Sequence, residues 1–257
     1  MNNSLLFPDY KELFQGCAAY IEEEKRDAMY KLARQLVNDA NWNPEKLAEG
    51  IGVLLLTWNA AFYTKYGSFD FDKLENFIEQ RMDDLKNYNK RTILSYEPND
   101  DKIVGNIFTE LLEVTKSVKK VGRTPVGTAK ALHLFSPEFF SIWDNAIAKK
   151  FKVHWGQKTQ VKSPECYIKL QHLTKRAVEN VLRSYENETG VSREIAIQHL
   201  CKKWHPKIAM AIYDVKPPIS KSLVKMVDEY NYVKYSMNVD ISKYRDVVLK
   251  VISHEEK

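Results

Sequence analysis

A single carboxylate stands in a stretch of apolar and basic residues near the middle of the chain. Asp144 is the only acid between Glu138 and Glu165, and its neighbours include Trp143 and two lysines. A carboxylate in such surroundings can stabilise positive charge that develops on a reacting carbon, and it can orient or activate an attacking water. A second interpretation is that Asp144 caps the N-terminus of a helix, which Asp does well. The two roles are compatible, because a capping Asp has a second oxygen that can face a ligand.

A lysine fourteen residues before this carboxylate is the candidate nucleophile. Lys130 carries a primary amine, and an amine with a lowered pKa can attack a sugar carbon and form a Schiff base. The alternative is that Lys130 contacts a phosphate group or is simply solvated. We favour this alternative, and with it a reaction in which water is the nucleophile.

Aromatic side chains and one amide are close together in residues 58–63. Trp58, Asn59 and Tyr63 lie on one expected helix, and Trp143 precedes the carboxylate. Aromatic faces can stack on a nucleobase, and an amide can read the polar edge of the base. These four residues are the expected base pocket. The alternative is that the aromatic side chains belong to the core, although an Asn in an apolar run must still find hydrogen-bond partners.

The positive charge of the chain is concentrated around these residues. The net charge is only +5 over 257 residues, but residues 116–158 hold nine basic residues and two acids, so this segment carries +7 and the remainder −2. Such a segment is suited to phosphate binding, and backbone amides of a glycine-bracketed turn before a helix can receive phosphate oxygens. The expected DNA contacts are Lys119, Lys120, Gly122, Arg123, Val126, Gly127 and Thr128. The alternative is a solvated basic surface without a partner.

The cysteines and histidines predict no metal site. The three cysteines are far apart in the sequence, and the spacing of His199, Cys201 and His205 offers no evident fourth ligand before Pro206, where a helix should break. We therefore expect no metal and no cofactor. Few, scattered cysteines predict a cytoplasmic protein, and the lack of a long apolar run predicts that it has no membrane partner. We also expect a monomer.

The elements that must position these residues are helices. Gly and Pro number nine each, which is low for a turn-dense sandwich or barrel. No segment alternates cleanly between apolar and polar residues. Residues 46–63 are apolar on nearly every side and predict a buried helix. Amphipathic helical spacing is found in residues 10–37, 70–85, 102–118, 164–185 and 220–235. The pattern predicts an all-α fold of about ten helices.

Residues 119–151, KKVGRTPVGTAKALHLFSPEFFSIWDNAIAKKF, resemble the catalytic core of the helix-hairpin-helix DNA glycosylase superfamily. Val126-Gly127-Thr128-Ala129 matches the end of the hairpin and the start of its second helix. Asp144 follows Thr128 by 16 residues, close to the spacing in the family, and residues 144–151 fit the pattern D-x-x-[IV]-x-x-x-[FL]. The chain departs from the family in three respects. Its hairpin is longer, and Lys130 is one position away from the usual nucleophile. It also lacks the four-cysteine iron–sulfur loop of one branch.

The resemblance implies a two-lobed helical unit with a helix-hairpin-helix motif. The expected parts are an N-terminal lobe of residues 1–100, the hairpin and catalytic segment of residues 102–155, and C-terminal helices in residues 164–257. It also implies an enzyme that flips a damaged or modified base from double-stranded DNA and hydrolyses its N-glycosidic bond, in repair or against modified foreign DNA. Asp144 would be catalytic, and Lys130 would add a lyase activity if it is nucleophilic. The alternatives are a non-catalytic helical nucleic-acid-binding module and a helical interaction protein.

Overall fold

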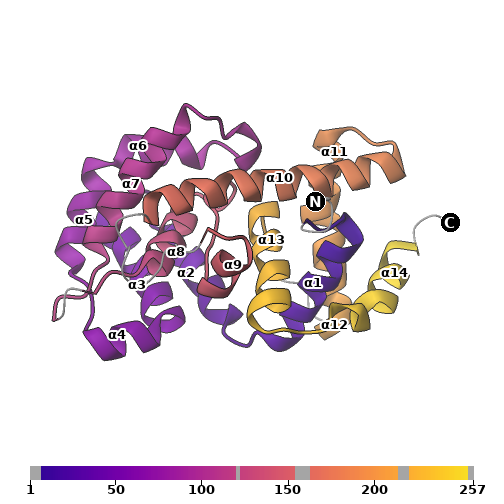
Figure 1. Cartoon of the computed structure of the whole chain (residues 1–257), viewed down its shortest axis with the longest axis horizontal. Helices are drawn as coiled ribbons and strands as arrows, with labels where there is room; N and C mark the ends of the chain where they lie inside the picture. The colour runs from indigo at the N-terminus through magenta and orange to yellow at the C-terminus, as the bar shows by residue number, and fades with distance from the viewer. Residues whose placement is uncertain (1–6, 120–121, 154–162, 214–219, 254–257) are drawn as a thin grey trace. The chain divides into compact units, whose positions relative to one another are not determined.

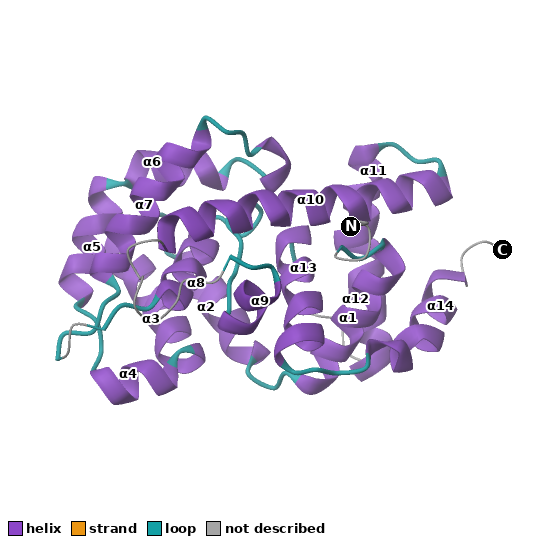
Figure 2. Cartoon of the chain, viewed as in Figure 1, coloured by secondary structure: helices purple, strands orange, loops and turns teal. Residues whose placement is uncertain are grey.

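The computed structural model describes residues 7–119, 122–153, 163–213 and 220–253. Within these ranges the chain consists of helices and loops and contains no strand (Figure 2). The all-α class predicted from the apolar spacing is therefore confirmed. No helix in the described ranges has both the length and the apolar character needed to cross a membrane.

The chain divides into two compact units, which differ from the expected lobes. The central unit is Arg26–His172, and the terminal unit joins Met1–Lys25 to Leu173–Lys257. Residues 1–100 therefore do not form one lobe. The expected single stripe of residues 10–37 is two helices, one in each unit (Figure 1).

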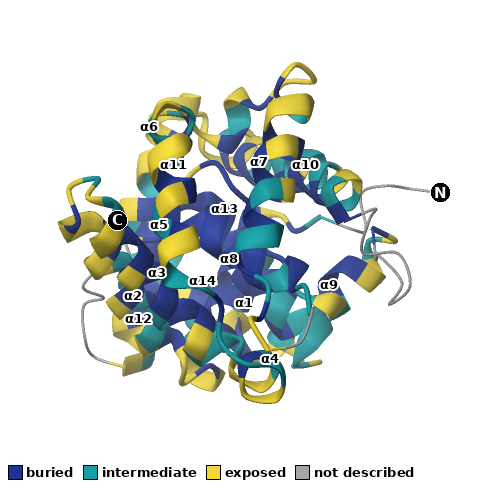
Figure 3. Ribbon diagram, turned by 90° about the vertical axis from the view of Figure 1, so that its left-hand side faces the viewer, coloured by how far each residue is buried: buried dark blue, intermediate teal, exposed yellow. Residues whose placement is uncertain are grey.

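The central unit is a set of helices packed around α8. Ten of the eleven residues of α8 are buried, and only Val126 is partly exposed, as Figure 3 illustrates for this helix. The apolar helix α3 packs against α2, α5 and α8. In chain order the helices are α2 (Asp27–Asp39), α3 (Pro44–Trp58), α4 (Ala60–Tyr66), α5 (Phe71–Gln80), α6 (Met82–Asn89), α7 (Asp100–Val114), α8 (Pro125–Phe135) and α9 (Asn145–Lys150), with a 3₁₀ turn at Ile93–Ser95. The boundary between the units falls within α10 (Ser163–Thr189).

The expected buried helix of residues 46–63 is interrupted at Asn59. The backbone of Asn59 leaves the helical region (φ −115°, ψ 23°), so that α3 ends at Trp58 and α4 begins at Ala60. Asn favours such positions because its side chain competes with the helical backbone for hydrogen bonds. The break places the side chain of Asn59 at the junction of two helices rather than on one helix face.

The second glycine of the expected glycine-bracketed connection lies inside α8, and the helix-hairpin-helix motif is not confirmed. Helix α8 begins at Pro125, and the side chain of Thr124 caps it by accepting a hydrogen bond from the backbone N–H of Gly127 at 3.0 Å. Thr as N-cap followed by Pro at the first helical position is a favoured helix start. Gly127 is therefore inside the first turn of α8, and the ten residues from 115 to 124 connect the two helices.

The terminal unit is arranged around α13, all nine residues of which are buried (Figure 3). Gly16 allows α1 to approach α13 closely, since a Cβ at this position would lie 2.8 Å from the Cα of Tyr230. The helices of the unit are α1 (Tyr10–Glu23), the second part of α10, α11 (Arg193–Gln198), α12 (His205–Tyr213), α13 (Leu223–Asn231) and α14 (Arg245–Ser253), with π-helical segments at His199–Trp204 and Tyr232–Ser236 and a 3₁₀ turn at Ile241–Tyr244.

Pro206 does not break the chain as expected. It lies in the first turn of α12, and the segment His199–Trp204 before it is π-helical. A proline tolerates the first turn of a helix, where its missing N–H is least needed. As a result α11, the π segment and α12 follow one another without a loop, and His205 is turned into the interior with 1% of its surface exposed.

Candidate functional site

Lys130 is at the centre of a polar cluster in the central unit. Its ammonium group donates hydrogen bonds to the backbone carbonyl of Trp58 at 3.2 Å and to the side-chain oxygen of Asn59 at 3.1 Å. The same nitrogen lies 5.5 Å from the centre of the Trp58 ring. Lys130 is only 8% exposed. The structure therefore brings together three of the predicted site residues, from the end of α3 and from α8.

Asn59 connects this lysine to the start of α8. Its amide nitrogen donates to Oγ1 of Thr124 at 2.7 Å, and the same oxygen accepts the backbone N–H of Gly127. A Cβ on Gly127 would lie 2.8 Å from Cγ2 of Thr124 and 3.0 Å from Nδ2 of Asn59. The absence of a side chain at position 127 is thus what allows Asn59 to reach the helix cap.

Trp58 is held by three neighbours. Tyr30 stacks on its ring at a centroid distance of 5.6 Å, and Lys130 lies over the ring as described above. The indole N–H donates to the backbone carbonyl of Arg26 at 2.9 Å. The residue remains partly exposed.

The histidine on α8 belongs to the core. His133 is fully buried, and its Nδ1 lies 2.7 Å from the carbonyl oxygen of Phe140. Because a carbonyl only accepts, Nδ1 carries a proton, and Nε2 forms a hydrogen bond with the hydroxyl of Tyr30 at 2.9 Å. This pair holds Tyr30 in place beneath Trp58, so His133 supports the cluster from within the core.

Tyr63 and Trp143 are core residues, which corrects the expectation that they line a base pocket. Tyr63 is 5% exposed, its hydroxyl donates to the carbonyl of Thr115 at 3.0 Å, and burial raises the pKa of its phenol well above the usual value. Trp143 is fully buried and stacks with Phe108 and Tyr167. Neither ring presents an open face on which a base could stack.

The groups of Gly127 and Thr128 that were expected to bind phosphate have partners within the fold. The backbone N–H of Gly127 is used by its Thr124 cap, and that of Thr128 donates to the carbonyl of Thr124 at 2.9 Å. The side chain of Thr128 is fully buried and hydrogen bonds with the hydroxyl of Thr115 at 3.0 Å. Contact of these two residues with DNA stays a prediction. Gly122 and Val126 are partly exposed.

Part of the basic segment is neutralised by an acid just outside it. Glu113 pairs with Arg123, and it also pairs with Lys116 at 3.0 Å. The hydrogen bond from Arg123 is the largest influence that holds the pKa of Glu113 below its usual value. Exposed lysines in the described part of residues 116–158 are Lys119, Lys149, Lys150 and Lys152. Lys120 and Lys158 lie outside the described residues.

Asp144 lies at the start of a helix, as its interpretation as an N-cap predicts. It is the N-cap of α9, and its Oδ1 accepts the backbone N–H of Ile147 at 2.8 Å. The residue is partly exposed, and Lys149 and Lys150 in the last turn of α9 are exposed. The carboxylate is therefore fixed in orientation by its own helix and stands next to a basic surface.

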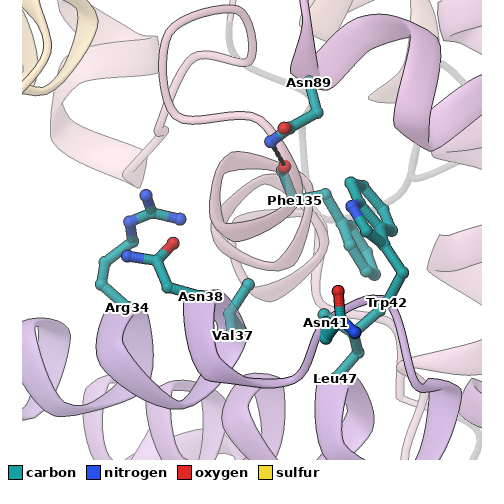
Figure 4. Close-up of a pocket in the computed structure, with 8 residues that line it drawn as sticks. All are labelled: Arg34, Val37, Asn38, Asn41, Trp42, Leu47, Asn89 and Phe135. Carbon is teal, nitrogen blue, oxygen red and sulfur yellow. Dashed lines mark hydrogen bonds between the residues drawn. The ribbon is translucent and has the colours of Figure 1, made fainter.

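A hollow of about 190 Å³ lies in the same unit, away from the sequence-predicted residues. The rings of Trp42 and Phe135 form one wall of it, and Asn89 donates to the carbonyl of Phe135 at the end of α8 (Figure 4). Arg34 donates to the carbonyl of Leu134 at 3.0 Å. The hollow is lined by Arg34, Val37, Asn38, Asn41, Trp42, Leu47, Asn89 and Phe135. Aromatic walls with a few polar groups suit a small planar ligand.

Sequence reasoning missed this hollow because its residues come from four separate segments. Asn41 and Trp42 have positive φ values of 46° and 62°, a conformation that is uncommon for residues other than glycine. The run of Asn and Asp residues around position 41 is the one local signal of a turn in the sequence.

Comparison of the chain with protein-family models, with curated proteins and with solved structures finds no match. The interpretation of the site therefore depends on the geometry described above and on the short resemblance in residues 119–151.

Proposed function

We propose that the chain is a DNA N-glycosylase, which extrudes a damaged or modified base from double-stranded DNA and hydrolyses its N-glycosidic bond. The observation that carries the proposal is the position of Asp144 at the start of α9, partly exposed and held by the N–H of Ile147. A carboxylate inside a longer helix and facing solvent would have argued against it. The resemblance of residues 119–151 to the catalytic core of the helix-hairpin-helix glycosylases points to the same residue.

The proposed reaction needs a fixed negative charge near the sugar. Cleavage of an N-glycosidic bond builds positive charge on the sugar ring, and a carboxylate stabilises that charge and orients the attacking water. The capping hydrogen bond from the N–H of Ile147 restrains the carboxylate of Asp144. Exposed Lys149, Lys150 and Lys152 follow it in the chain and would contact backbone phosphates.

Water is the proposed nucleophile rather than Lys130. The ammonium group of Lys130 is hydrogen bonded by two neutral acceptors and lies over the ring of Trp58. The nitrogen would have to leave these contacts before it could attack a sugar carbon. The environment of Lys130 therefore supports a monofunctional enzyme.

The experiment is an abasic-site assay of the full chain on duplexes that each contain one lesion or hypermodified base. Wild type should leave abasic sites in at least one duplex, and Asp144→Asn should lose at least about 100-fold of the rate, because a fixed charge contributes at this scale to catalysis. Asp70→Asn is the matched control, since Asp70 likewise caps a helix of the central unit, by accepting the N–H of Lys73. Both variants keep a good cap, because Asn replaces Asp well at that position. Activity unchanged in Asp144→Asn would overturn the assignment.

A non-catalytic nucleic-acid-binding module is the second candidate. The observation that favours it is that Tyr63 and Trp143 are buried and that Tyr30 and Lys130 pack against the ring of Trp58, so the expected residues do not form an open base pocket in this conformation. This candidate predicts duplex binding that weakens steeply with salt, without abasic sites on any duplex of the panel. The same assay with a parallel binding measurement separates the two.

A further inference from the structure

Three chemically different side chains converge in the interior of the terminal unit. Cys17 comes from α1, His205 begins α12, and Glu229 lies on α13. The cysteine sulfur, a ring nitrogen and a carboxylate oxygen all lie within 4.8 Å of one another. Each residue is at most 1% exposed. The sequence gives no sign of this group, because the three positions are spread over more than 200 residues.

The imidazole and the carboxylate of this group have polar atoms without the partners that buried atoms normally have, whereas the thiol of Cys17 donates to the carbonyl of Met226 at 3.8 Å. Among the described residues, neither ring nitrogen of His205 has a hydrogen-bond partner, and Oε2 of Glu229 has none. Nε2 and Oε2 are 3.9 Å apart, which is too long for a hydrogen bond. Buried polar atoms are nearly always satisfied in native proteins, by protein groups, water or an ion.

The other oxygen of the same carboxylate is fully used. Lys221 pairs with Oε1 of Glu229, and the ammonium of Lys225 lies 3.7 Å from that oxygen and 2.8 Å from Asp228. The two lysines of this cluster thus pair with two acids, Asp228 and Glu229. Oε2 is the oxygen left to face His205 and Cys17.

We propose that Cys17, His205 and Glu229 bind a divalent transition-metal ion, with zinc as the expected occupant. Thiolate, imidazole and carboxylate are the three side-chain ligand types of protein zinc sites. Tetrahedral zinc with ligand bonds of about 2.0–2.3 Å holds its donors about 3.3–3.8 Å apart. Nε2 and Oε2 are 3.9 Å apart, and all three donor atoms lie within 4.8 Å of one another, so they would move closer together on binding. A water molecule would complete the tetrahedron.

Binding is balanced by release of one proton. Zn²⁺ replaces the proton of the Cys17 thiol, a sulfur–zinc bond forms, and the proton passes to solvent. The ion would tie α1, from the N-terminal part of the chain, to α12 and α13 from the C-terminal part. Because the ligands converge only in the folded unit, metal binding would add to the stability of the fold.

The test uses the full chain, purified without chelator. We expect about one equivalent of zinc per chain by elemental analysis, a lower melting temperature after its removal, and recovery when zinc alone is added back. Replacement by Co²⁺ should give a near-ultraviolet thiolate-to-metal charge-transfer band. The double variant Cys166→Ser/Cys201→Ser keeps Cys17 as its sole cysteine, so it should retain both the band and the zinc.

The variants Cys17→Ser and His205→Gln should lose the zinc, with helix content measured by circular dichroism to confirm folding. If Cys17→Ser does not fold, the double variant still tests the proposal. Cys17 is its only cysteine, so any thiolate-to-metal charge-transfer band must come from that residue. A folded wild type that binds neither zinc nor Co²⁺ would overturn the proposal, and so would a charge-transfer band that disappears in the double variant. In either case a buried water would be the occupant.

Discussion

The side-chain oxygen of Asn59 lies 3.1 Å from the ammonium nitrogen of Lys130, although the two residues are 71 positions apart in the chain. Asn59 is also the residue at which α3 ends, and its amide nitrogen reaches the cap of α8 through Thr124. The side-chain amide of Asn59 thus connects the break between α3 and α4 to the buried Lys130 and to the start of α8. The geometry of the candidate site depends on this residue more than on any of its aromatic neighbours.

Replacement of Asn59 by Ala should destabilise the central unit. The change removes an acceptor from Lys130 and a donor to Thr124, and unsatisfied buried partners cost about 1–3 kcal/mol in the free energy of unfolding. Urea unfolding followed by circular dichroism would measure it. Asn87→Ala is the control, since Asn87 is exposed on α6. Equal midpoints for the two variants would contradict the role assigned to Asn59.

Gly127→Ala tests the close packing at the start of α8. A Cβ there would crowd Thr124 and Asn59, and overpacking of this kind costs about 1–3 kcal/mol, more than the helix propensity gained from Ala. Gly105→Ala in α7 is the matched control, because its Cβ would meet only the tip of Ile168 at 3.1 Å. Thermal melting should show Gly127→Ala below wild type and Gly105→Ala at or above it. The reverse order would show that the Asn59 contact tolerates a side chain.

The helices could be predicted from the sequence because their apolar faces repeat with helical spacing, but several of their ends could not. The apolar run through residues 46–63 continues past Asn59, so nothing in the periodicity marks the break there. In residues 122–127 the two glycines suggested a turn, whereas Thr124 and Pro125 start a helix. Local capping by Thr124 decides the start of α8, whereas the side chain of Asn59 is held by Thr124 and Lys130, which are 65 and 71 positions away in the chain. The hydrophobic pattern marks neither of these contacts.

In the candidate site, the role of a residue could be predicted only where that role follows from its local place in the sequence. Asp144 was expected as a cap and is one. Trp143, its neighbour in sequence, turns into the aromatic core instead, because side-chain direction depends on packing that one sequence does not reveal. The group of Cys17, His205 and Glu229 arises entirely from tertiary structure, since its members come from three helices.

The ion pair of Asp100 and Arg91 should make the stability of the central unit depend on acidic pH. Burial by itself would raise the pKa of Asp100, but the two hydrogen bonds from Arg91, at 2.7 Å each, and one from the N–H of Glu97 outweigh it and hold the pKa below its usual value. Because the folded pKa is lowered, this stabilisation is complete above about pH 4, near the unfolded pKa, and is lost as the pH falls through the folded pKa.

Asp100→Asn should therefore cost about 2 kcal/mol at neutral pH, as expected for one side of a partly buried pair. The difference from wild type should shrink as the pH is lowered below about 4, which denaturant midpoints at several pH values would measure. Asp83→Asn is the control, because Asp83 is exposed on α6. A difference that stays constant with pH would show that the ion pair does not contribute.

Lys130 should not form a Schiff base with an abasic site. The lysine is 8% exposed and its nitrogen is engaged by Trp58 and Asn59, so it is not placed to reach an aldehyde carbon in the folded chain. A duplex with a preformed abasic site, incubated with the full chain and sodium borohydride, supplies the aldehyde without requiring the natural substrate base. Wild type, Lys130→Met and the exposed control Lys119→Met should all give the same low background of trapped protein on a denaturing gel. A covalent product that forms with wild type and Lys119→Met but not with Lys130→Met would identify Lys130 as a nucleophile, and the enzyme would then be a glycosylase with lyase activity.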